Sequence, residues 1–427
     1  MWRHGSFRIF GWATLVVAAF AAAPLAAAER HVSVASKSLQ KTIAEAAPGD
    51  ILRLGPGDHA GPIIIAKPIT LIGERKTRIV GSGSGSVLTV DAAGVTVRGI
   101  EITGSGLKQE TMDAGIRLTK RATGARIEDN RLIDNLIGVD VKGPRDVLIA
   151  GNTILGRSDL RMNDRGNGVY VWNSPGLVVE KNLFRFGRDG IFVNTSRNNT
   201  FRDNRFENLR FAVHYMYTNN GNITGNISIG NHIGYALMFS SKLTVRDNVS
   251  IGDRDHGIML NYANSAKITG NVIRKGGTKC LFMYNANKNE ISGNRFESCG
   301  IGVHFTAGSE RNAIFENAFV ANRTQVKYVG SRWLDWSAKG RGNYWSDHAA
   351  FDLNGDGIAD SVYRPNDMID HILWTQPSAK LLLGSPAMQI LRWSQSQFPA
   401  LLPGGVFDPA PLMRAPVSSK SIEGANG

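Results

Sequence analysis

Four side chains that could bind a soft metal ion occur in neighbouring stretches of similar sequence: His214, Met216, Met238 and Met259. Imidazole nitrogen and thioether sulfur together suit Cu(I). Residues two apart share a face of a strand, so His214 and Met216 would point the same way into water. Met238 would then lie beside Met216 on the next repeat, with Met259 one repeat further. The simpler alternative is that these methionines form an adaptable docking surface and bind no metal.

Met112 and Met162 form a second candidate pair for copper, and each lies in an insertion. The paths through 99–115 and 152–168 are both longer, by about eight residues, than the equivalent path elsewhere in the chain. Both insertions follow the same part of the repeat, so we expect two loops that project from one edge of the fold. Alternatively, they are tolerated surface insertions without a function.

Oxygen-bearing residues in 352–360 follow the first part of a calcium-binding loop, in which ligands occupy positions 1, 3, 5, 7 and 9. The matching residues are Asp352, Asn354, Asp356, Ile358 (through its carbonyl oxygen) and Asp360. Position 12, where such loops carry a bidentate glutamate, is Tyr363, so Asp347 or Asp367 would have to supply that ligand. We expect a structural calcium ion here, and the alternative is a plain Asx-rich turn.

The elements that position these side chains are repeats of about 22 residues between Gly168 and Phe319. Each repeat begins with a small residue that is followed by alternating apolar residues. The small residues are Gly168, Gly190, Ala212, Gly234, Gly257, Cys280 and Gly302. About 14 residues later each repeat has an asparagine before a short apolar pair. These asparagines are Asn182, Asn204, Asn226, Asn248, Asn271, Asn294 and Asn317.

This pattern predicts an all-β fold, a right-handed parallel β-helix with coils of about 22 residues. The coils would stack at strand spacing, roughly 4.8 Å. We expect the asparagines to form a ladder in which each amide donates to the amide of the next coil. The stretch from Lys37 to Ala47 predicts a short helix that covers the N-terminal end of the solenoid. The density of glycine and asparagine disfavours the rival, a helical repeat array.

The strand positions that point away from the tube are aromatic and sulfur-rich, which is typical of a partner or ligand surface. The aromatic members of this predicted partner surface are Tyr170, Trp172, Phe192, Phe282 and Tyr284. The same columns hold no charged residue between Tyr170 and Tyr284, whereas sugar-cleaving solenoids need carboxylates at an open cleft. We therefore expect no enzyme, and a secreted polysaccharide-binding or polysaccharide-cleaving β-helix is the alternative.

Composition divides the chain into five segments. They are a signal peptide (1–28), the β-helix (29–335), an aromatic turn with the calcium-like loop (336–367), a proline-broken apolar segment (368–411) and a disordered tail (412–427). Export makes nucleic acid an unsuitable partner despite the formal net charge of +13. No run of about 18 apolar residues follows the signal peptide, so we expect no membrane span in the mature chain. Cys280 and Cys299 could form a disulfide or remain buried thiols.

The combination of features resembles the NosD family, whose members serve the maturation of the copper enzyme nitrous-oxide reductase. The likeness rests on the exported solenoid with its glycine and asparagine columns, on the turn Asn343-Tyr344-Trp345-Ser346-Asp347 before the stretch 352–360, and on the apolar segment from Met368 to Pro411. The repeats are shared with carbohydrate-binding and sugar-hydrolysing solenoids, so the C-terminal third is the more specific part.

The resemblance implies a periplasmic subunit of an ABC-type complex that is peripheral to the inner membrane. It would act as a chaperone and docking scaffold for transient Cu(I), together with a permease, a separate ATPase subunit, a copper-donor lipoprotein and nitrous-oxide reductase. The segment 368–411 would then dock on the permease. The residues expected at that contact are Leu373, Trp374, Leu391, Trp393 and Phe398. Within this segment Ser385 to Trp393 is the best helix candidate.

Overall fold

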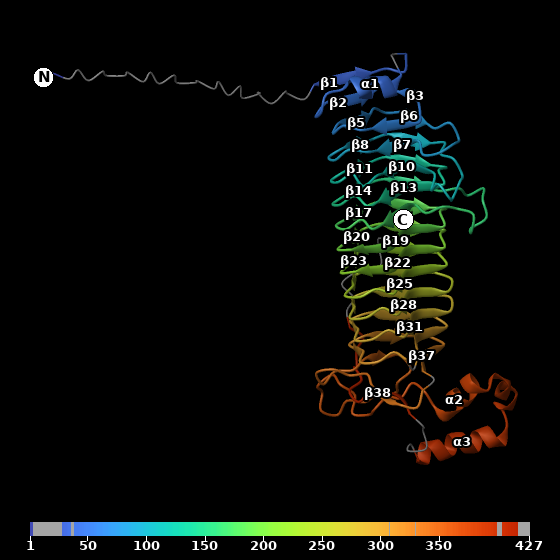
Figure 1. Cartoon of the computed structure of the whole chain (residues 1–427). Helices are drawn as coiled ribbons and strands as arrows, with labels where there is room; N and C mark the ends of the chain where they lie inside the picture. Colours follow the sequence, from blue (N-terminus) through green and yellow to red (C-terminus); the bar gives the residue numbers. More distant parts are fainter. Residues whose placement is uncertain (3–27, 36–37, 307, 329, 399–403, 417–427) are drawn as a thin grey trace.

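The computed structural model describes residues 1–2, 28–35, 38–306, 308–328, 330–398 and 404–416. Most of the predicted signal peptide, residues 3–27, lies outside the described residues. The described chain winds into a column of stacked coils, in which three parallel sheets run along the column (Figure 1). The prediction of an all-β parallel solenoid with a helix near its N-terminus is confirmed.

Each coil contributes one short strand to each sheet, here called sheets A, B and C. Sheet A contains β1 (Glu29–Val32), β2 (Ile51–Leu54), β5 (Thr70–Gly73), β8 (Thr96–Arg98), β11 (Arg126–Glu128), β14 (Leu148–Ala150), β17 (Val178–Glu180), β20 (Thr200–Arg202), β23 (Asn222–Thr224), β26 (Thr244–Arg246), β29 (Lys267–Thr269), β32 (Glu290–Ser292) and β35 (Ala313–Phe315). Sheet B contains β3 (Gly57–Ala60), β6 (Thr77–Val80), β9 (Glu101–Thr103), β12 (Arg131–Ile133), β15 (Thr153–Leu155), β18 (Leu183–Arg185), β21 (Arg205–Glu207), β24 (Ile227–Ile229), β27 (Val249–Ile251), β30 (Val272–Arg274), β33 (Arg295–Glu297), β36 (Ala318–Val320) and β39 (Tyr344–Trp345).

Sheet C carries the candidate site. It contains β4 (Ile63–Ile65), β7 (Leu88–Val90), β10 (Ala114–Leu118), β13 (Ile137–Lys142), β16 (Val169–Trp172), β19 (Asp189–Arg197), β22 (Phe211–Asn219), β25 (Ile233–Met238), β28 (His256–Asn261), β31 (Lys279–Tyr284), β34 (Ile301–Phe305) and β37 (Thr324–Tyr328). On β22 the side chains of Val213 and Tyr215 are fully buried in the tube, as the alternation predicts. On the preceding strand, β19, packing requires the small residue to be glycine, because a Cβ on Gly190 would clash with the Phe206 ring and the Ala212 carbonyl.

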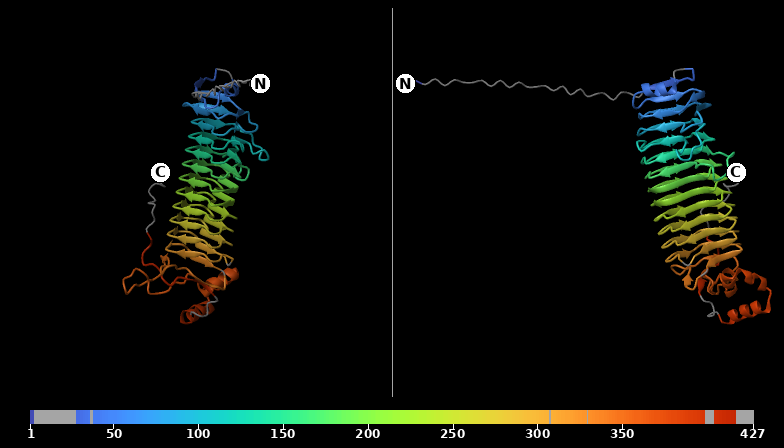
Figure 2. Two further views of the ribbon diagram at one scale, coloured as in Figure 1. Left: turned by 60° about the vertical axis from the view of Figure 1, so that its left-hand side comes forward. Right: turned by 45° about the vertical axis from the view of Figure 1, so that its right-hand side comes forward.

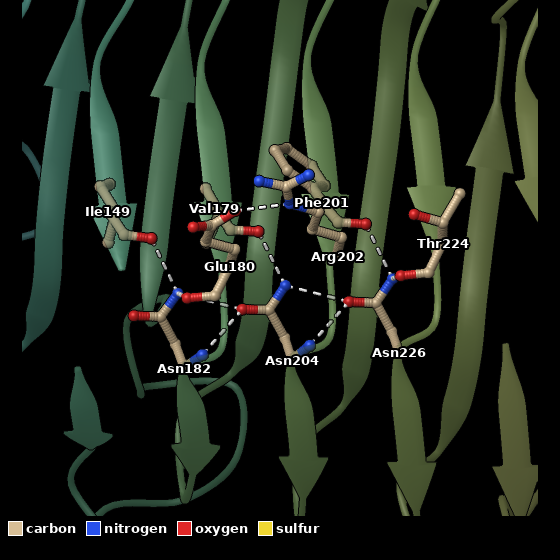
Figure 3. Close-up of polar contacts among 9 residues, drawn as sticks. All are labelled: Ile149, Val179, Glu180, Asn182, Phe201, Arg202, Asn204, Thr224 and Asn226. Carbon is tan, nitrogen blue, oxygen red and sulfur yellow. Dashed lines mark hydrogen bonds and ion pairs between the residues drawn. The ribbon is translucent and has the colours of Figure 1, made fainter. Parts of the chain in front are cut away.

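The asparagine column forms the predicted ladder inside the tube (Figure 3). The Asn182 amide donates to the Asn204 Oδ1 over 3.0 Å, and the Asn204 amide donates to the Asn226 Oδ1 over 3.0 Å. Each amide also donates to a carbonyl one coil before it, as Asn204 does to Val179. The ladder does not stop at Asn317, whose amide donates to Asn343 over 2.9 Å. The aromatic turn that contains Asn343 is therefore also the last rung of the ladder.

Both ends of the tube are covered (Figures 1 and 2). At the N-terminal end, α1 (Leu39–Glu45) buries Leu39 and Ile43 against the first coils. At the C-terminal end, the Trp345 ring stacks on Phe319 with centroids 4.2 Å apart. A two-stranded sheet of β38 (Trp333–Asp335) and β40 (Gly405–Phe407) adds to this cap. The last described helices are α2 (Met368–Thr375), the 3-10 helix η1 (Pro377–Leu382) and α3 (Pro386–Gln397).

Two expectations about the C-terminal half are now resolved. Cys280 and Cys299 form a disulfide between neighbouring coils, which is one of the two alternatives that the sequence leaves open. The expected disorder from residue 412 does not apply to the first residues of the tail. Leu412 is buried and donates its N–H to the Asn343 carbonyl over 2.9 Å, because it packs on the cap that the ladder ends in. Residues 417–427 lie outside the described part of the chain.

A second polar column inside the tube contains a carboxyl group, Asp253. Its oxygens accept hydrogen bonds from the Asn231 N–H (2.8 Å) and from the hydroxyls of Ser228 (2.7 Å) and Ser250 (2.6 Å). Burial, which these hydrogen bonds offset only in part, raises the pKa of Asp253 to about 6. The folded chain therefore binds a proton at this site more tightly than the unfolded chain, in which the pKa of aspartate is about 3.9.

We expect Asp253→Asn to stabilise the protein at neutral pH. The raised pKa makes this group a cost to folding that grows as the pH rises from about 4 to about 6 and is complete above that. The variant should have a free energy of unfolding about 1–3 kcal/mol higher at pH 7.5, with little gain near pH 4.5. Asn231 already occupies the equivalent position one coil earlier. Urea denaturation at both pH values measures this, and the exposed Asp164→Asn is the control. Lower stability of Asp253→Asn at pH 7.5 would contradict the prediction.

Candidate metal site and partner surfaces

The candidate copper residues lie on the outward side of sheet C, on β22, β25 and β28. Met216 and Met238 are direct neighbours in the strand register, so their side chains stand side by side at strand spacing of about 4.8 Å. Ala236 lies between His214 on one side and Met259 on the other. Ala236 thus has two predicted ligands on its flanking strands, and Met238 follows it by two residues on its own strand. The three methionines are half-buried.

His214 is not open to water, and here the expectation from the sequence is wrong. The residue is only 7% exposed because its imidazole stacks on Phe192 at 4.5 Å and meets the edge of Phe211 at 5.0 Å. The Nδ1 atom lies 3.1 Å from the Asp189 carboxylate. Asp189 also accepts two hydrogen bonds from Arg210, at 2.8 and 2.6 Å. His214 is therefore held by the buried Asp189 carboxylate, which is itself paired with the half-buried Arg210, and strand alternation singled out neither residue.

The Asp189 contact determines which His214 nitrogen is free. Burial alone would raise the pKa of Asp189, but the hydrogen bonds from His214 and Arg210 outweigh it and hold that pKa below its ordinary value. An ionised carboxylate can only accept, so His214 Nδ1 must donate to it. The Nε2 atom is buried and has no hydrogen-bond partner in the described structure. In the neutral ring it carries a lone pair, as in metal-binding histidines that are oriented by a carboxylate.

Two further imidazoles on sheet C, His256 and His304, were not singled out from the sequence. Both imidazoles pack against the same ring, Phe282. The centroid of that ring lies 5.2 Å from the His256 ring centroid and 5.1 Å from the His304 ring centroid. Burial, followed by the nearby Lys327 and Lys279, lowers the pKa of His304 to about 4. Burial likewise lowers the pKa of His256. Both rings are therefore neutral at pH 7, but Phe282 separates them.

The second candidate pair, Met112 and Met162, lies on the two insertion loops. The loops project from the same edge of the column, between sheets B and C (Figure 1). They touch each other, because the Gln109 amide donates to the Asp164 carbonyl over 3.1 Å. Met112 packs on a small cluster of Ala114, Leu136 and Ile137, and Met162 is half-buried. Copper binding by this pair stays a prediction.

The calcium-like loop is exposed, and its carboxylates bond to their own backbone. Asp352 accepts from the N–H groups of Gly355 (2.7 Å) and Gly357 (2.8 Å), and Asp360 accepts from Leu353 (2.7 Å). Ile358 is the carbonyl candidate, and its N–H is bonded to Asp356. Within the described residues no group of three His, Cys, Asp or Glu side chains is arranged to hold a metal ion. Calcium binding at Asp352, Asn354, Asp356, Ile358 and Asp360 stays a prediction.

The residues of the predicted partner surface differ in how exposed their side chains are. Trp172 and Tyr284 are exposed, whereas Tyr170, Phe192 and Phe282 are half-buried against their neighbours. Three exposed aromatic residues beside this surface were missed: Tyr217, Phe239 and Tyr262. They recur at the repeat spacing one position after the outward columns, so reading the columns one residue further would have found them.

The charged residues at the other end of sheet C do not form an open acid-base site. Asp140 is fully buried, with Arg117 at 3.1 Å and Lys142 at 3.6 Å. Burial raises the pKa of Asp140. Arg117 also donates to the Met112 carbonyl over 2.7 Å, so this cluster ties the first insertion loop to the solenoid.

The segment that was expected to dock on a membrane subunit forms an arm at the C-terminal end of the column (Figure 1). It is attached through Asn366, whose amide donates to the Val326 carbonyl over 2.6 Å, and through Lys327, which lies 5.8 Å from the Trp374 ring centroid. Leu373, Trp374 and Leu391 are half-buried. Trp393 and Phe398 are 64% and 61% exposed. No helix among the described residues is long and apolar enough to cross a membrane.

Comparisons with known proteins give a consistent result. Residues 150–350 match the family model described as periplasmic copper-binding protein (NosD). The chain is 41% identical over 385 residues to a probable ABC transporter binding protein NosD of Stutzerimonas stutzeri, and the match covers 87% of this chain and 88% of that protein. A protein of the same description from Pseudomonas aeruginosa is 40% identical over 378 residues, which cover 86% and 88% of the two chains.

The column also resembles solved structures of other solenoids. A mannuronic acid specific polysaccharide family 6 lyase from human gut microbiota superposes with a TM-score of 0.51 and 13% identity, over 87% of this chain and 99% of the lyase. At this identity the likeness shows the fold alone.

Proposed function

The chain belongs to the NosD family, and on that premise we propose that it is the periplasmic subunit of an ABC-type complex that delivers copper to nitrous-oxide reductase during maturation. The matching family is described as periplasmic and copper-binding, and the two relatives are named as ABC transporter binding proteins. The observation that carries the proposal in this chain is the neighbouring pair of thioethers, Met216 and Met238, with His214 and Met259 opposite Ala236 on the flanking strands.

The ligand chemistry of the chain suits Cu(I) that is held briefly. Thiolates bind copper most strongly, but both cysteines of this chain are joined in a disulfide. The soft donors that remain are methionine sulfur and histidine nitrogen. Met216 and Met238 offer two neutral sulfurs at strand spacing, and Met259 and His214 border the same small side chain. Neutral donors on a half-buried surface can release the ion to a partner, as a chaperone must.

The remaining parts of the chain fit a docking scaffold. The signal peptide would export it to the periplasm, and the arm with Leu373, Trp374, Leu391, Trp393 and Phe398 would attach it to the permease of the complex. The two exposed rings of the arm give such a contact an apolar centre. ATP hydrolysis would belong to a separate cytoplasmic subunit, and copper would arrive from a donor lipoprotein.

The variant Met216→Ala/Met238→Ala should bind Cu(I) at least tenfold more weakly than the unchanged protein, about 1.4 kcal/mol or more, because it removes both adjacent sulfurs. Competition titration of the purified mature chain with a chromophoric Cu(I) chelator measures this. Met112→Ala/Met162→Ala is the matched control, since it removes two half-buried sulfurs elsewhere. Equal copper affinity of Met216→Ala/Met238→Ala and the unchanged chain would rule out this site, and a loss in the control alone would move the site to the insertion loops.

A further inference from the structure

The three aromatic residues beside the outward columns occupy an unfavourable backbone conformation. Tyr217, Phe239 and Tyr262 have φ values of 52°, 48° and 51°. This left-handed region is rare for residues other than glycine and asparagine, and for bulky side chains it is an outlier. The equivalent positions on the flanking coils hold Asn173, Thr195 and Asn285, also with positive φ. The middle coils thus place large rings where the backbone prefers a small polar residue.

These rings form a continuous exposed row, which we call the aromatic ridge: Tyr217, Phe239, Tyr262 and Tyr284. Neighbouring centroids are 5.1, 5.2 and 5.8 Å apart in that order. The four residues are between 38% and 53% exposed. The core does not require them, because they are exposed and the tube is filled by other side chains, such as the fully buried Tyr215 and Leu237. A strained backbone that presents exposed rings is the kind of outlier that marks a functional surface.

The aromatic ridge borders the candidate copper residues. Tyr217 follows Met216 and Phe239 follows Met238 in the chain, so the ridge and the adjacent sulfurs occupy the same two coils. A protein that approaches the methionine pair would therefore meet the ridge residues directly after it in the chain.

The corner stretches that carry the ridge hold only positive charges, and Glu310 on the following coil pairs with Arg332. In the stretches of sequence that form this corner, residues 172–176, 194–198, 216–220, 238–242, 261–265 and 284–288, there is no aspartate or glutamate. The same stretches carry Arg197, Lys242 and Lys288. All three are exposed, and none has an ion pair among the described residues. An apolar row beside unpaired cations is complementary to an apolar patch with an acidic rim.

We propose that the aromatic ridge docks the copper-carrying protein that exchanges the ion with Met216 and Met238, through an apolar patch with an acidic rim on that protein. The inference rests on the proposed function of the methionine pair. A polysaccharide suits the ridge less well, because sugar rings stack on free aromatic faces. Phe239 has rings on both sides, with interplanar angles of 21° and 9°, and so has no free face to offer.

The test replaces the ridge by the residue that other coils use at this corner: Tyr217→Asn/Phe239→Asn/Tyr262→Asn. The matched control is Phe186→Asn, which changes an aromatic residue with φ of 62° at the corner after sheet B. The probes are the copper-loaded soluble domain of the donor lipoprotein, apo nitrous-oxide reductase and alginate oligosaccharides, each titrated by calorimetry against the mature chain at low and high salt. Thermal denaturation and Cu(I) titration of the variants alone report on folding and on the metal site.

We expect the ridge variant to bind one of the two copper proteins at least tenfold more weakly, and wild-type binding to weaken as salt is raised. The control should bind normally, and the ridge variant should fold and keep the Cu(I) affinity of the unchanged chain. Unchanged affinity for both proteins would overturn the proposal, as would a variant that loses only alginate binding. Failure of the metal site is recognised separately, because the unchanged chain would then bind no Cu(I) in the titration without partners.

Discussion

Replacement of Asn204 by alanine should lower the free energy of unfolding by about 3–5 kcal/mol, because it leaves several buried polar groups without partners. The Asn204 amide donates to the Val179 carbonyl (2.9 Å) and to the Asn226 Oδ1 (3.0 Å). Its Oδ1 accepts from the Asn182 backbone N–H (3.1 Å) and from the Asn182 amide (3.0 Å). All of these atoms lie inside the tube, where water cannot replace the lost side chain (Figure 3).

Urea denaturation followed by far-UV circular dichroism measures this loss. Asn163→Ala is the control, because Asn163 is exposed on the second insertion loop, and it should change the free energy of unfolding by less than about 0.5 kcal/mol. If Asn204→Ala were no more destabilising than Asn163→Ala, the ladder would be a consequence of coil stacking and not a source of stability.

Replacement of Asp408 by alanine should be about as damaging, because this carboxylate closes the C-terminal end of the tube. Asp408 is fully buried and accepts hydrogen bonds from the Asn343 N–H (2.6 Å), the Trp345 indole (2.8 Å) and the Ala410 N–H (3.1 Å). Burial raises the pKa of Asp408, and the hydrogen bonds offset that rise in part. The variant leaves at least two buried donors unsatisfied, which corresponds to about 3–5 kcal/mol.

The loss at Asp408 should be local at first. Hydrogen exchange should increase most in β39 and β40, and light scattering should show self-association, because an open last coil exposes unpaired strand edges. Asp164→Ala is the control, since Asp164 is exposed on an insertion loop. Unchanged exchange in β39 and β40 would mean that the cap is held by the stacking of Trp345 on Phe319 and not by the carboxylate.

The last asparagine of the ladder, Asn343, could not be predicted from the repeat spacing. From Asn182 to Asn317 the column recurs at 22 or 23 residues, and the amides follow it. The next rung, Asn343, is 26 residues after Asn317. The extra residues lie in the excursion that contains β38, which pairs with β40 from far along the chain. The regular spacing of the asparagines therefore does not predict Asn343, because its position depends on the pairing of β38 with the distant strand β40.

The candidate metal site also combines features that the sequence predicts with features that it does not. Alternation along a strand and a constant coil length predict that the Met216 and Met238 side chains lie side by side. The strand register confirms that these two residues are neighbours. The burial of His214 does not follow from either. It depends on the rings of Phe192 and Phe211 closing over the imidazole, and on Asp189 from the preceding coil reaching Nδ1.

The sequence alone determined three features: parallel coils of nearly constant length, the direction of each strand side chain and the stacking of the asparagines. Each of them depends on residues at a regular separation. Only the tertiary structure determined how far each outward side chain is buried and how the C-terminal end of the tube is covered. It also determined the strained row of Tyr217, Phe239 and Tyr262. They arise where side chains of unequal size on adjacent coils, or segments far apart in the chain, share one space, and no repeat period describes that sharing.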